Sequence, residues 1–286
     1  MLFGAVVVIQ AELQTLGIAP LTAVGLRYLV SAAVCFSLLL ASRRPLLPVR
    51  GERLRAFALG AVVYALQSLL FYLALGHGTA GAVSILFYTY PVLVLAITLQ
   101  QTRTAPGRTA VLAATLSVAG ATLLVATDRL VTLDVEGVLL ALASSACAAG
   151  FLVAQSRMLP RSAHMPAAAM VSTGVAASTL MAAPVLDDQQ IISSTAAWLL
   201  IISGIATALA TAAMYVALQR LGAPRTSAIL TAQTAVAVAG SWWVLHEPVL
   251  AGQLVGGVAI IGAVVLAARN DGAGPRRRDL PENLRS

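Results

Sequence analysis

The stretch FYLALGHGTAGAVSI at residues 71–85 lies over MYVALQRLGAPRTSA at residues 214–228 when the chain is shifted against itself by 143 residues. This register needs no gap, and within it Tyr72 meets Tyr215. A repeat of this length is too long for a solenoid unit and is typical of the duplicated halves of many membrane proteins. The sequence therefore predicts two structurally related halves.

The composition indicates that the solvent of this chain is lipid. Hydrophobic residues make up 59% of the 286 residues and charged residues 10%, whereas a soluble domain is roughly 45–50% apolar. A helix of about 20 apolar residues crosses the hydrocarbon layer and satisfies its own backbone groups there. Apolar runs of about this length occur at residues 1–17, 21–41, 55–75, 80–100, 108–127, 136–156, 166–186, 195–217, 226–245 and 250–268. We expect an all-α integral membrane protein with ten transmembrane helices.

The charged residues sort by side of the membrane. Basic residues follow the second, fourth, sixth and eighth spans and fill the C-terminal tail, whereas the intervening loops are acidic apart from Arg129. By the positive-inside rule, both termini are then cytoplasmic. The high pI of about 10.2 is therefore attributed to membrane topology, and no nucleic-acid partner is expected. Residues 269–286 are expected to form a disordered cytoplasmic tail.

An odd number of spans in each half makes the second half start on the opposite side of the membrane. Arg44 is equivalent to Asp187, so a basic residue in one copy corresponds to an acidic residue in the other. We therefore predict two inverted five-helix repeats, residues 1–127 with a short first span and residues 136–268. Inverted repeats provide two related conformations, one open to each side, around a site near the bilayer midplane.

An ordered set of short motifs resembles the EamA-like family of the drug/metabolite transporter superfamily over residues 1 to about 268. The matching motifs are the FG at Phe3–Gly4, the LRYLVSAA segment with Arg27, the pair Tyr90–Pro91 in the fourth span, and the HEP at His246–Pro248 before a Gly-rich tenth span. The chain departs from the family at Gln100 and Gln101, where a Glu is usual. The resemblance implies a carrier whose third, fourth, eighth and ninth spans surround a central cavity.

Polar side chains form stripes in these four spans. A polar group in lipid is costly and tends to face the bundle interior, and residues three or four apart share one helical face. The predicted substrate-binding residues are Tyr64, Gln67, Ser68 and Phe71 in the third span, Ser84 and Tyr88 in the fourth, Thr207 and Thr211 in the eighth, and Ser227, Thr231 and Thr234 in the ninth. Interhelical hydrogen bonding is the alternative role for the Ser and Thr residues. Pro91 predicts a kink.

Glu12 and Arg27 are the only acidic and basic residues well inside the predicted spans. Both lie toward the external ends of adjacent spans, so an ion pair between them is one interpretation. The repeat places Gln155 opposite Glu12 and Met170 opposite Arg27, so this pair would exist in one half only. The other interpretation is that Glu12 binds a substrate amine or a coupling proton.

The remaining chemically distinctive residues favour packing roles. Cys35 and Cys147 lie in apolar spans and indicate neither a disulfide framework nor a metal site, and we expect no cofactor and no catalytic residue. His77 lies in a short loop and is expected to be solvated. Gly252 and Gly256 form a GxxxG pair, which suits either a homodimer or close packing within the monomer.

These observations favour a carrier in the bacterial cytoplasmic membrane that moves a small organic solute by alternating access. The solute would be an amino acid, a metabolite or a drug, and export is the commoner direction in the family that the chain resembles. A membrane-embedded enzyme and a structural or signalling membrane protein are the alternatives. An enzyme would need a cluster of reactive groups, and the sequence offers none.

Overall fold

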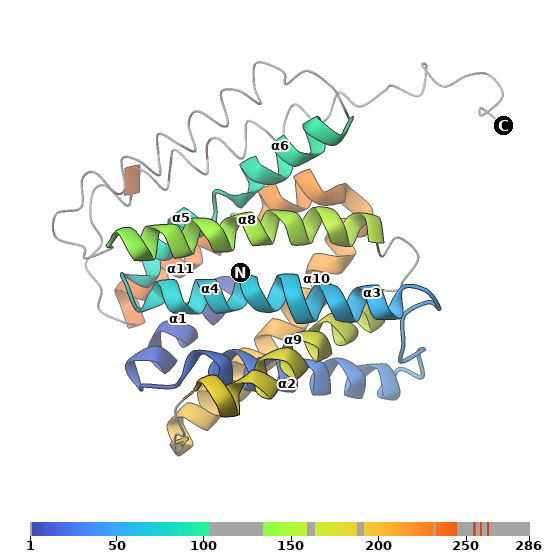
Figure 1. The fold of residues 1–286 in the computed structure, drawn as a ribbon, viewed down its shortest axis with the longest axis horizontal. Helices are drawn as coiled ribbons and strands as arrows, with labels where there is room; N and C mark the ends of the chain where they lie inside the picture. Colours follow the sequence, from blue (N-terminus) through green and yellow to red (C-terminus); the bar gives the residue numbers. More distant parts are fainter. Residues whose placement is uncertain are drawn as a thin grey trace.

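The computed structural model of the chain is a bundle of helices packed side by side (Figure 1). It describes residues 2–102, 134–158, 164–187, 192–230 and 233–244, with isolated positions between residues 254 and 262. Throughout this part of the chain the regular structure is helical and contains no strand. The elements are α1 (Leu2–Thr15), α2 (Pro20–Ala41), α3 (Arg53–Ala58), the π-helical turn η1 (Leu59–Tyr64), α4 (Ala65–Leu75), α5 (Ala80–Phe87), α6 (Tyr90–Thr102), α8 (Val135–Met158), α9 (His164–Leu186), α10 (Ser194–Leu230) and α11 (Gln233–Val244).

Six described segments are long and apolar enough to cross a membrane. They are Pro20–Ala41, Arg53–Leu75, Ala80–Gln101, Val135–Met158, Met165–Leu186 and Ser194–Leu218, and each lies within two residues of a predicted span. α1 is apolar but has only 14 residues, in agreement with the predicted short first span. The predicted spans at 108–127 and 250–268 lie wholly or largely outside the described residues, so the prediction of ten helices is not confirmed.

The boundary between the predicted eighth and ninth spans is wrong. The sequence predicts a turn between residues 217 and 226, whereas α10 continues as one helix of 37 residues to Leu230. Pro224 lies in this stretch and does not end the helix. Long Ala- and Leu-rich segments on both sides favour the helix, and their propensity outweighs the local turn signal.

α2 and α9, which occupy equivalent positions in the 143-residue repeat, run antiparallel and in contact. Asp187 follows the end of α9, and its Oδ2 accepts two hydrogen bonds from Thr22, near the start of α2. The backbone N of Thr22 donates one at 2.7 Å and its Oγ1 donates the other at 2.8 Å. Farther along, Ser31 Oγ of α2 lies 3.2 Å from Ser172 Oγ of α9. Residues late in α9 therefore meet residues early in α2.

Several helix crossings depend on glycine, and two of them correspond under the repeat. A Cβ atom at Gly60 in η1 would overlap the backbone carbonyl of Val171 in α9, and a Cβ atom at Gly204 in α10 would overlap the side chain of Val30 in α2. Only a residue without a side chain lets two helices approach this closely. The crossing of α9 on η1 and the crossing of α2 on α10 are equivalent under the repeat.

The predicted third and fourth spans both deviate from a regular α-helix. The third is continuous but contains the π-helical turn η1, a deviation often found at functional sites. The fourth is broken, because α5 ends at Phe87 and α6 begins at Tyr90. Pro91 stands in the first turn of α6, where its missing N–H removes no helical hydrogen bond. The fourth span is thus interrupted at Tyr88 and Thr89, close to the kink that the sequence predicts at Pro91.

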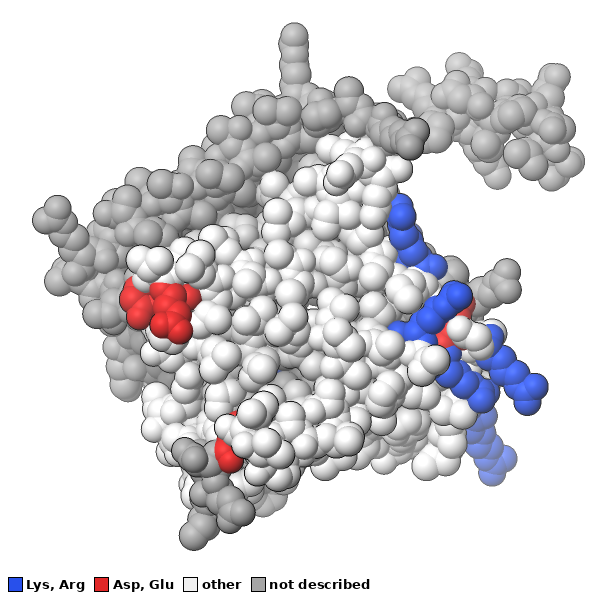
Figure 2. Space-filling model, in the orientation of Figure 1, with Lys and Arg blue, Asp and Glu red and all other residues white. Residues whose placement is uncertain are grey.

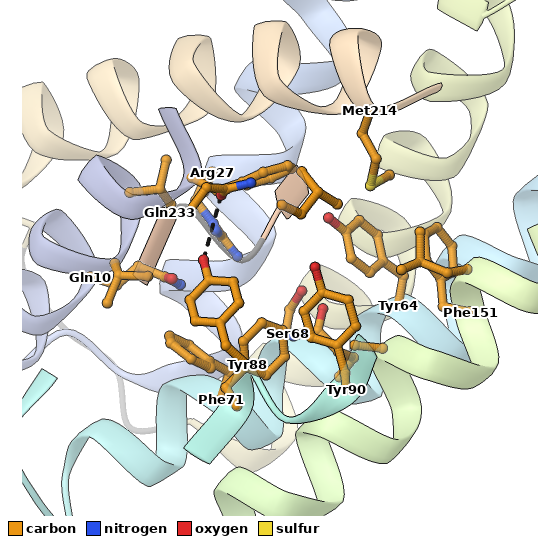
Figure 3. A pocket seen from close by; sticks show the side chains of 18 of the residues that line it. Gln10, Arg27, Tyr64, Ser68, Phe71, Tyr88, Tyr90, Phe151, Met214 and Gln233 are labelled. Atoms are coloured by element: carbon orange, nitrogen blue, oxygen red, sulfur yellow. Dashed lines mark hydrogen bonds between the residues drawn. The ribbon is translucent and has the colours of Figure 1, made fainter. Parts of the chain in front are cut away.

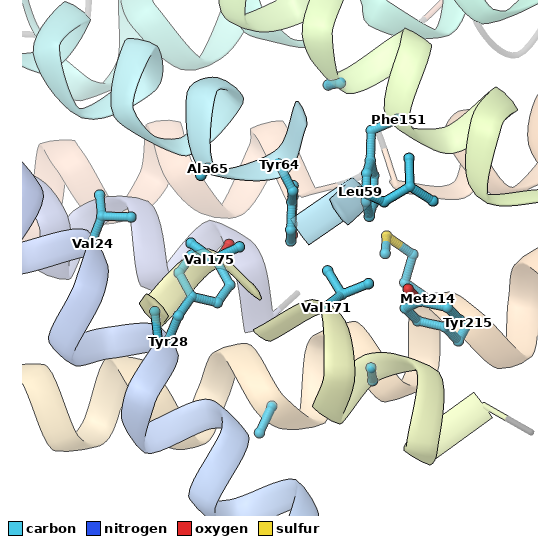
Figure 4. Packing of buried hydrophobic residues seen from close by; sticks show 14 of the residues in the cluster. Val24, Tyr28, Leu59, Tyr64, Ala65, Phe151, Val171, Val175, Met214 and Tyr215 are labelled. Atoms are coloured by element: carbon cyan, nitrogen blue, oxygen red, sulfur yellow. The ribbon is translucent and has the colours of Figure 1, made fainter. Parts of the chain in front are cut away.

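The hydrophobic core joins helices from both halves of the chain (Figure 4). One large buried cluster brings together residues of α2, η1, α8, α9 and α10. Among its members are Val24, Tyr28, Leu59, Phe151, Val171, Val175, Met214 and Tyr215. The two halves therefore share one interior, and a space within this interior is lined by both of them.

Charged side chains lie at two opposite ends of the bundle (Figure 2). In this view the arginines gather at one end and most of the acidic side chains at the other, with an uncharged surface between them. This separation is the pattern that the alternating basic and acidic loops predict.

His77 is not simply a solvated loop residue. Its Nδ1 lies 3.0 Å from Asp134 Oδ2, and its Nε2 lies 4.0 Å from Glu136 Oε1. The hydrogen bond to Asp134 raises the pKa of His77 above its ordinary value. The pKa of Asp134 is lowered, first by the backbone N–H of Gly137 and then by His77. This contact ties the loop between α4 and α5 to the start of α8.

Candidate functional site: a central aromatic cavity

A cavity of about 90 Å³ lies inside the bundle, at the place where the two halves meet. Side chains from α1, α2, η1, α4, α5, α6, α8, α10 and α11 and from the break between α5 and α6 line it. Eight of its lining residues are aromatic, and Figure 3 shows how several of these rings surround the space. The aromatic lining residues are Phe3, Tyr28, Tyr64, Phe71, Phe87, Tyr88, Tyr90 and Phe151.

The aromatic rings hold one another in place on two sides of the cavity. On one side, the Tyr64 ring stacks on Phe151 of α8 with centroids 4.3 Å apart and an interplanar angle of 8°. Tyr28 of α2 meets Tyr64 edge-on at 5.5 Å. On the other side, Phe87 lies 5.0 Å from Phe71 and makes further ring contacts with Tyr88 and Tyr90. Such arrangements are the preferred geometries of aromatic pairs.

Neutral polar groups fill the gaps between the rings. Gln67 Nε2 donates a hydrogen bond to Ser144 Oγ of α8 at 3.2 Å, while Ser144 Oγ donates to the Gln67 carbonyl oxygen at 2.8 Å. Tyr88 OH donates to Gln233 Oε1 of α11 over 3.5 Å (Figure 3). These bonds connect α4 with α8 and the helix break with α11, so the polar contacts of the cavity also cross between the halves.

Arg27 is the only charged side chain among the described residues that line the cavity. It is 4% exposed, and its Nε has no hydrogen-bond partner among the described residues. Its guanidinium carbon lies 4.5 Å from the centroid of the Tyr28 ring, which is a cation–π contact. Figure 3 shows the guanidinium beside Gln233 and Tyr88, on the same side of the cavity.

The structure brings together five of the residues predicted from the polar stripes. Tyr64, Gln67, Ser68, Phe71 and Tyr88 all line the cavity. The four from the third span share one face across η1 and α4, as their spacing predicts.

Three other predicted residues do not line the cavity. Ser84, Thr207 and Thr211 are fully buried, and their hydroxyl groups have no partner among the described residues. Thr207 and Thr211 are the repeat equivalents of Tyr64 and Ser68. All three side chains are short and end within the packed helix interface, so they do not reach the space that Tyr64 and Tyr88 reach. The side chains of Ser227, Thr231 and Thr234 lie outside the described residues.

Glu12 does not line the cavity, and the ion pair considered for Glu12 and Arg27 is not formed. No ion pair of Glu12 or Arg27 is found among the described residues. Gln10, two residues before Glu12, lines the cavity instead. Two residues correspond to about 200° around a helix, so a cavity-facing Gln10 directs Glu12 to the far side of α1.

Several lining residues were not predicted from the sequence. Gln10 and Gln233 are polar groups inside apolar spans, so the rule that identified Gln67 would have identified them also. Tyr28 and Phe151 carry no such signal, because aromatic residues are ordinary packing residues in a membrane helix. The repeat provides a further signal, since three of its pairs line the cavity. These pairs are Phe71 with Met214, Phe87 with Leu230, and Tyr90 with Gln233.

Metal chemistry has no visible basis in the part of the chain that the structure describes. No group of three His, Cys, Asp or Glu side chains lies close enough together there to hold an ion. Cys35 and Cys147 are both free thiols.

Long apolar helices packed around a cavity between two related halves define a multi-pass membrane protein built from a duplicated unit. The model of the EamA-like transporter family matches this chain twice, over residues 1–126 and 135–269. The chain therefore belongs to the EamA-like transporter family, a family of membrane transporters, and the resemblance seen in the sequence motifs is confirmed. The two matched segments correspond to the two halves of the repeat.

Solved structures show the same fold. Among 23 matching chains, one protein crystal structure superposes with a TM-score of 0.72 at 16% sequence identity, covering 94% of this chain and 96% of that chain. No curated protein matches the sequence. The substrate therefore has to be inferred from the cavity itself.

Proposed function

We propose that this protein carries a small organic solute across the cytoplasmic membrane of a bacterium by alternating access, in the direction of export. The cavity at the junction of the two halves is the observation that carries the proposal. It combines aromatic side chains with a few polar groups, and both halves line it. Ligand sites usually have this character. Tyr64, Gln67, Ser68, Phe71 and Tyr88 are the proposed substrate-binding residues.

The antiparallel contact of α2 with α9 supports an inverted repeat. These helices are equivalent under the 143-residue shift, and Thr22 at the start of one is hydrogen bonded to Asp187 at the end of the other. Equivalent helices that run in opposite directions are what two oppositely oriented halves require. Such halves exchange conformations around a fixed central site, which is the basis of alternating access.

The separation of charge between the two ends of the bundle supports an orientation with both termini in the cytoplasm. Reporter fusions truncated after Arg50 are expected to give a cytoplasmic signal, and fusions truncated after Asp187 an external signal. A full-length C-terminal fusion should again report the cytoplasm. A cytoplasmic signal after Asp187 would contradict the inverted repeat.

Cysteine accessibility tests whether the cavity is a water-filled substrate site. In a chain without Cys35 and Cys147, cysteines at positions 64, 67 and 88 are expected to react with a small, charged thiol reagent, because thiolates form only in contact with water. A cysteine in place of Val62 is the control, since Val62 is 63% exposed on the outer surface of the bundle and should be surrounded by lipid. Reaction rates are measured by mass spectrometry of protein in liposomes.

The same measurement at Thr231, the repeat equivalent of Tyr88, extends the test to the second half. A cysteine at position 231 is expected to react as the one at position 88 does. If the cavity positions are as inert as position 62, the polar side chains only hold the helices together and the proposed substrate site is wrong.

A further inference from the structure

We propose that the cavity binds organic monoanions, in which an aromatic or similar apolar body carries a single carboxylate, and that Arg27 binds this carboxylate. The inference rests on the proposed transport function and specifies its substrate class. It also replaces the interpretation of Glu12 as the residue that binds a substrate amine, since Glu12 lies outside the cavity lining.

Arg27 has no counter-ion among the described residues. A guanidinium group does not lose its proton in proteins, and a buried charge without a partner is strongly unfavourable. No carboxylate in the described part of the chain lies within 4.0 Å of Arg27, and the cation–π contact with Tyr28 compensates only part of the charge. The guanidinium is thus available to an anion that enters the cavity, with which it can form two parallel hydrogen bonds.

The surroundings of Arg27 favour an anion over a cation. Gln10 and Gln233, which line the same cavity, can each donate a hydrogen bond from the side-chain amide to a carboxylate oxygen. The described lining contains no acidic residue, so a substrate ammonium group would meet Arg27 without any counter-charge.

The rest of the cavity suits a compact aromatic or apolar body. Tyr64 and Phe151 form one stacked wall, and Phe71, Phe87 and Tyr90 form the other. Flat rings at these positions offer faces and edges on which a second aromatic group can pack. The repeat equivalent of Arg27 is Met170, and Arg27 is the one cationic group in the described lining. A single carboxylate is therefore matched, whereas a second would be buried without a partner.

Three small molecules with the same ring and different charge test this inference. Phenylacetate is the anion, phenylacetamide its neutral analogue and phenethylamine the corresponding cation. Binding to the purified full-length protein in lipid nanodiscs is measured by titration calorimetry and by the rise in melting temperature. We expect phenylacetate to bind about tenfold or more tightly than either analogue, as for a charge-assisted bidentate contact.

Variants locate the anion contact. Arg27→Gln is expected to remove the preference for phenylacetate, whereas Arg27→Lys keeps part of it because the charge remains. Arg44→Gln is the matched control, because Arg44 is exposed just beyond the end of α2. This variant should bind phenylacetate as tightly as the unmodified protein does. If Arg27→Gln does not fold, the loss of affinity in Arg27→Lys relative to the unmodified protein provides the test.

Two sets of outcomes overturn the proposal. Absence of binding by all three molecules, or binding of phenethylamine as tight as that of phenylacetate, excludes the monoanion class. An unchanged preference in Arg27→Gln, or unchanged affinity in Arg27→Lys where Arg27→Gln is unfolded, excludes Arg27 as the contact. Counterflow of labelled probes in proteoliposomes distinguishes failure of this inference from failure of the proposed transport function. Uptake of phenethylamine alone would reject the monoanion class and leave the transport function intact. Binding of phenylacetate without uptake of any probe would reject the transport function.

Discussion

Replacing Gly60 with alanine is expected to prevent stable folding of the protein. The added Cβ would overlap the carbonyl oxygen, carbonyl carbon and Cα of Val171, and backbone atoms cannot rotate away as the end of a side chain can. Relief would require α9 to move away from η1 along the whole crossing. Overpacking a core typically costs about 1–3 kcal/mol even where side chains can adjust, so a backbone overlap should cost more.

Gly150→Ala is the matched control for this substitution. Gly150 also lies inside a helix, α8, but a Cβ atom there would have nothing within 4 Å. Alanine is favoured over glycine in a helix by about 0.5–1 kcal/mol, so this variant should melt at the same temperature or slightly higher. Both are measured as the temperature at which half of the monodisperse protein is lost in detergent. Equal melting temperatures for the two variants would show that the α9 crossing tolerates separation.

Replacing Tyr64 with alanine is expected to have the second largest effect, on both stability and transport. The Tyr64 ring is 7% exposed, stacks on Phe151 at 4.3 Å and meets Tyr28 at 5.5 Å, so it joins α2, η1 and α8 at the wall of the cavity. Removing a buried aromatic ring costs about 3–5 kcal/mol. The same change removes one wall of the proposed substrate site.

Two comparisons separate these contributions. Tyr64→Phe keeps the ring and its contacts and should melt near the temperature of the unmodified protein, with transport retained. Trp198→Ala removes a larger ring that is 64% exposed on the bundle surface, and it should change neither property substantially. Melting is followed in detergent and transport by counterflow in proteoliposomes. A Tyr64→Ala protein as stable as Trp198→Ala would mean that this aromatic wall does not hold the halves together.

Much of the helical framework follows from composition and periodicity. Long apolar runs bounded by charged loops predict six of the spans because lipid permits few alternatives to a helix. The sharing of one helical face by Tyr64, Gln67, Ser68 and Phe71 was also predictable. Regular spacing determines on which side of a helix each side chain lies, even when the helix contains a π-helical turn. Within the described residues, these are the features for which local sequence is sufficient.

The unpredicted features depend on contacts between helices. The position of the break, at Tyr88 and Thr89 rather than at Pro91, and the continuation of α10 beyond residue 217 are choices between two acceptable local structures, and packing between helices decides between them. The role of Phe151 is of the same kind, because nothing in its own segment distinguishes it from other apolar residues of α8. Glu12 does not line the cavity, because the helical geometry that directs Gln10 toward the cavity turns Glu12 to the other side of α1.

The presence of Arg27 in one half only has a consequence for the energetics of a transport cycle. If the two halves exchange conformations, the states open to either side are related in their backbone by a pseudo-two-fold axis. Their side chains are not related in this way, because Met170 takes the place of Arg27. The two states then differ in free energy when empty and in affinity when loaded. Detailed balance still fixes the equilibrium solute ratio of an uncoupled exchange, at unity for a neutral solute and at the value set by the membrane potential for a monoanion. The asymmetry therefore alters the resting population and the speed in each direction, while net accumulation requires a gradient from outside the protein.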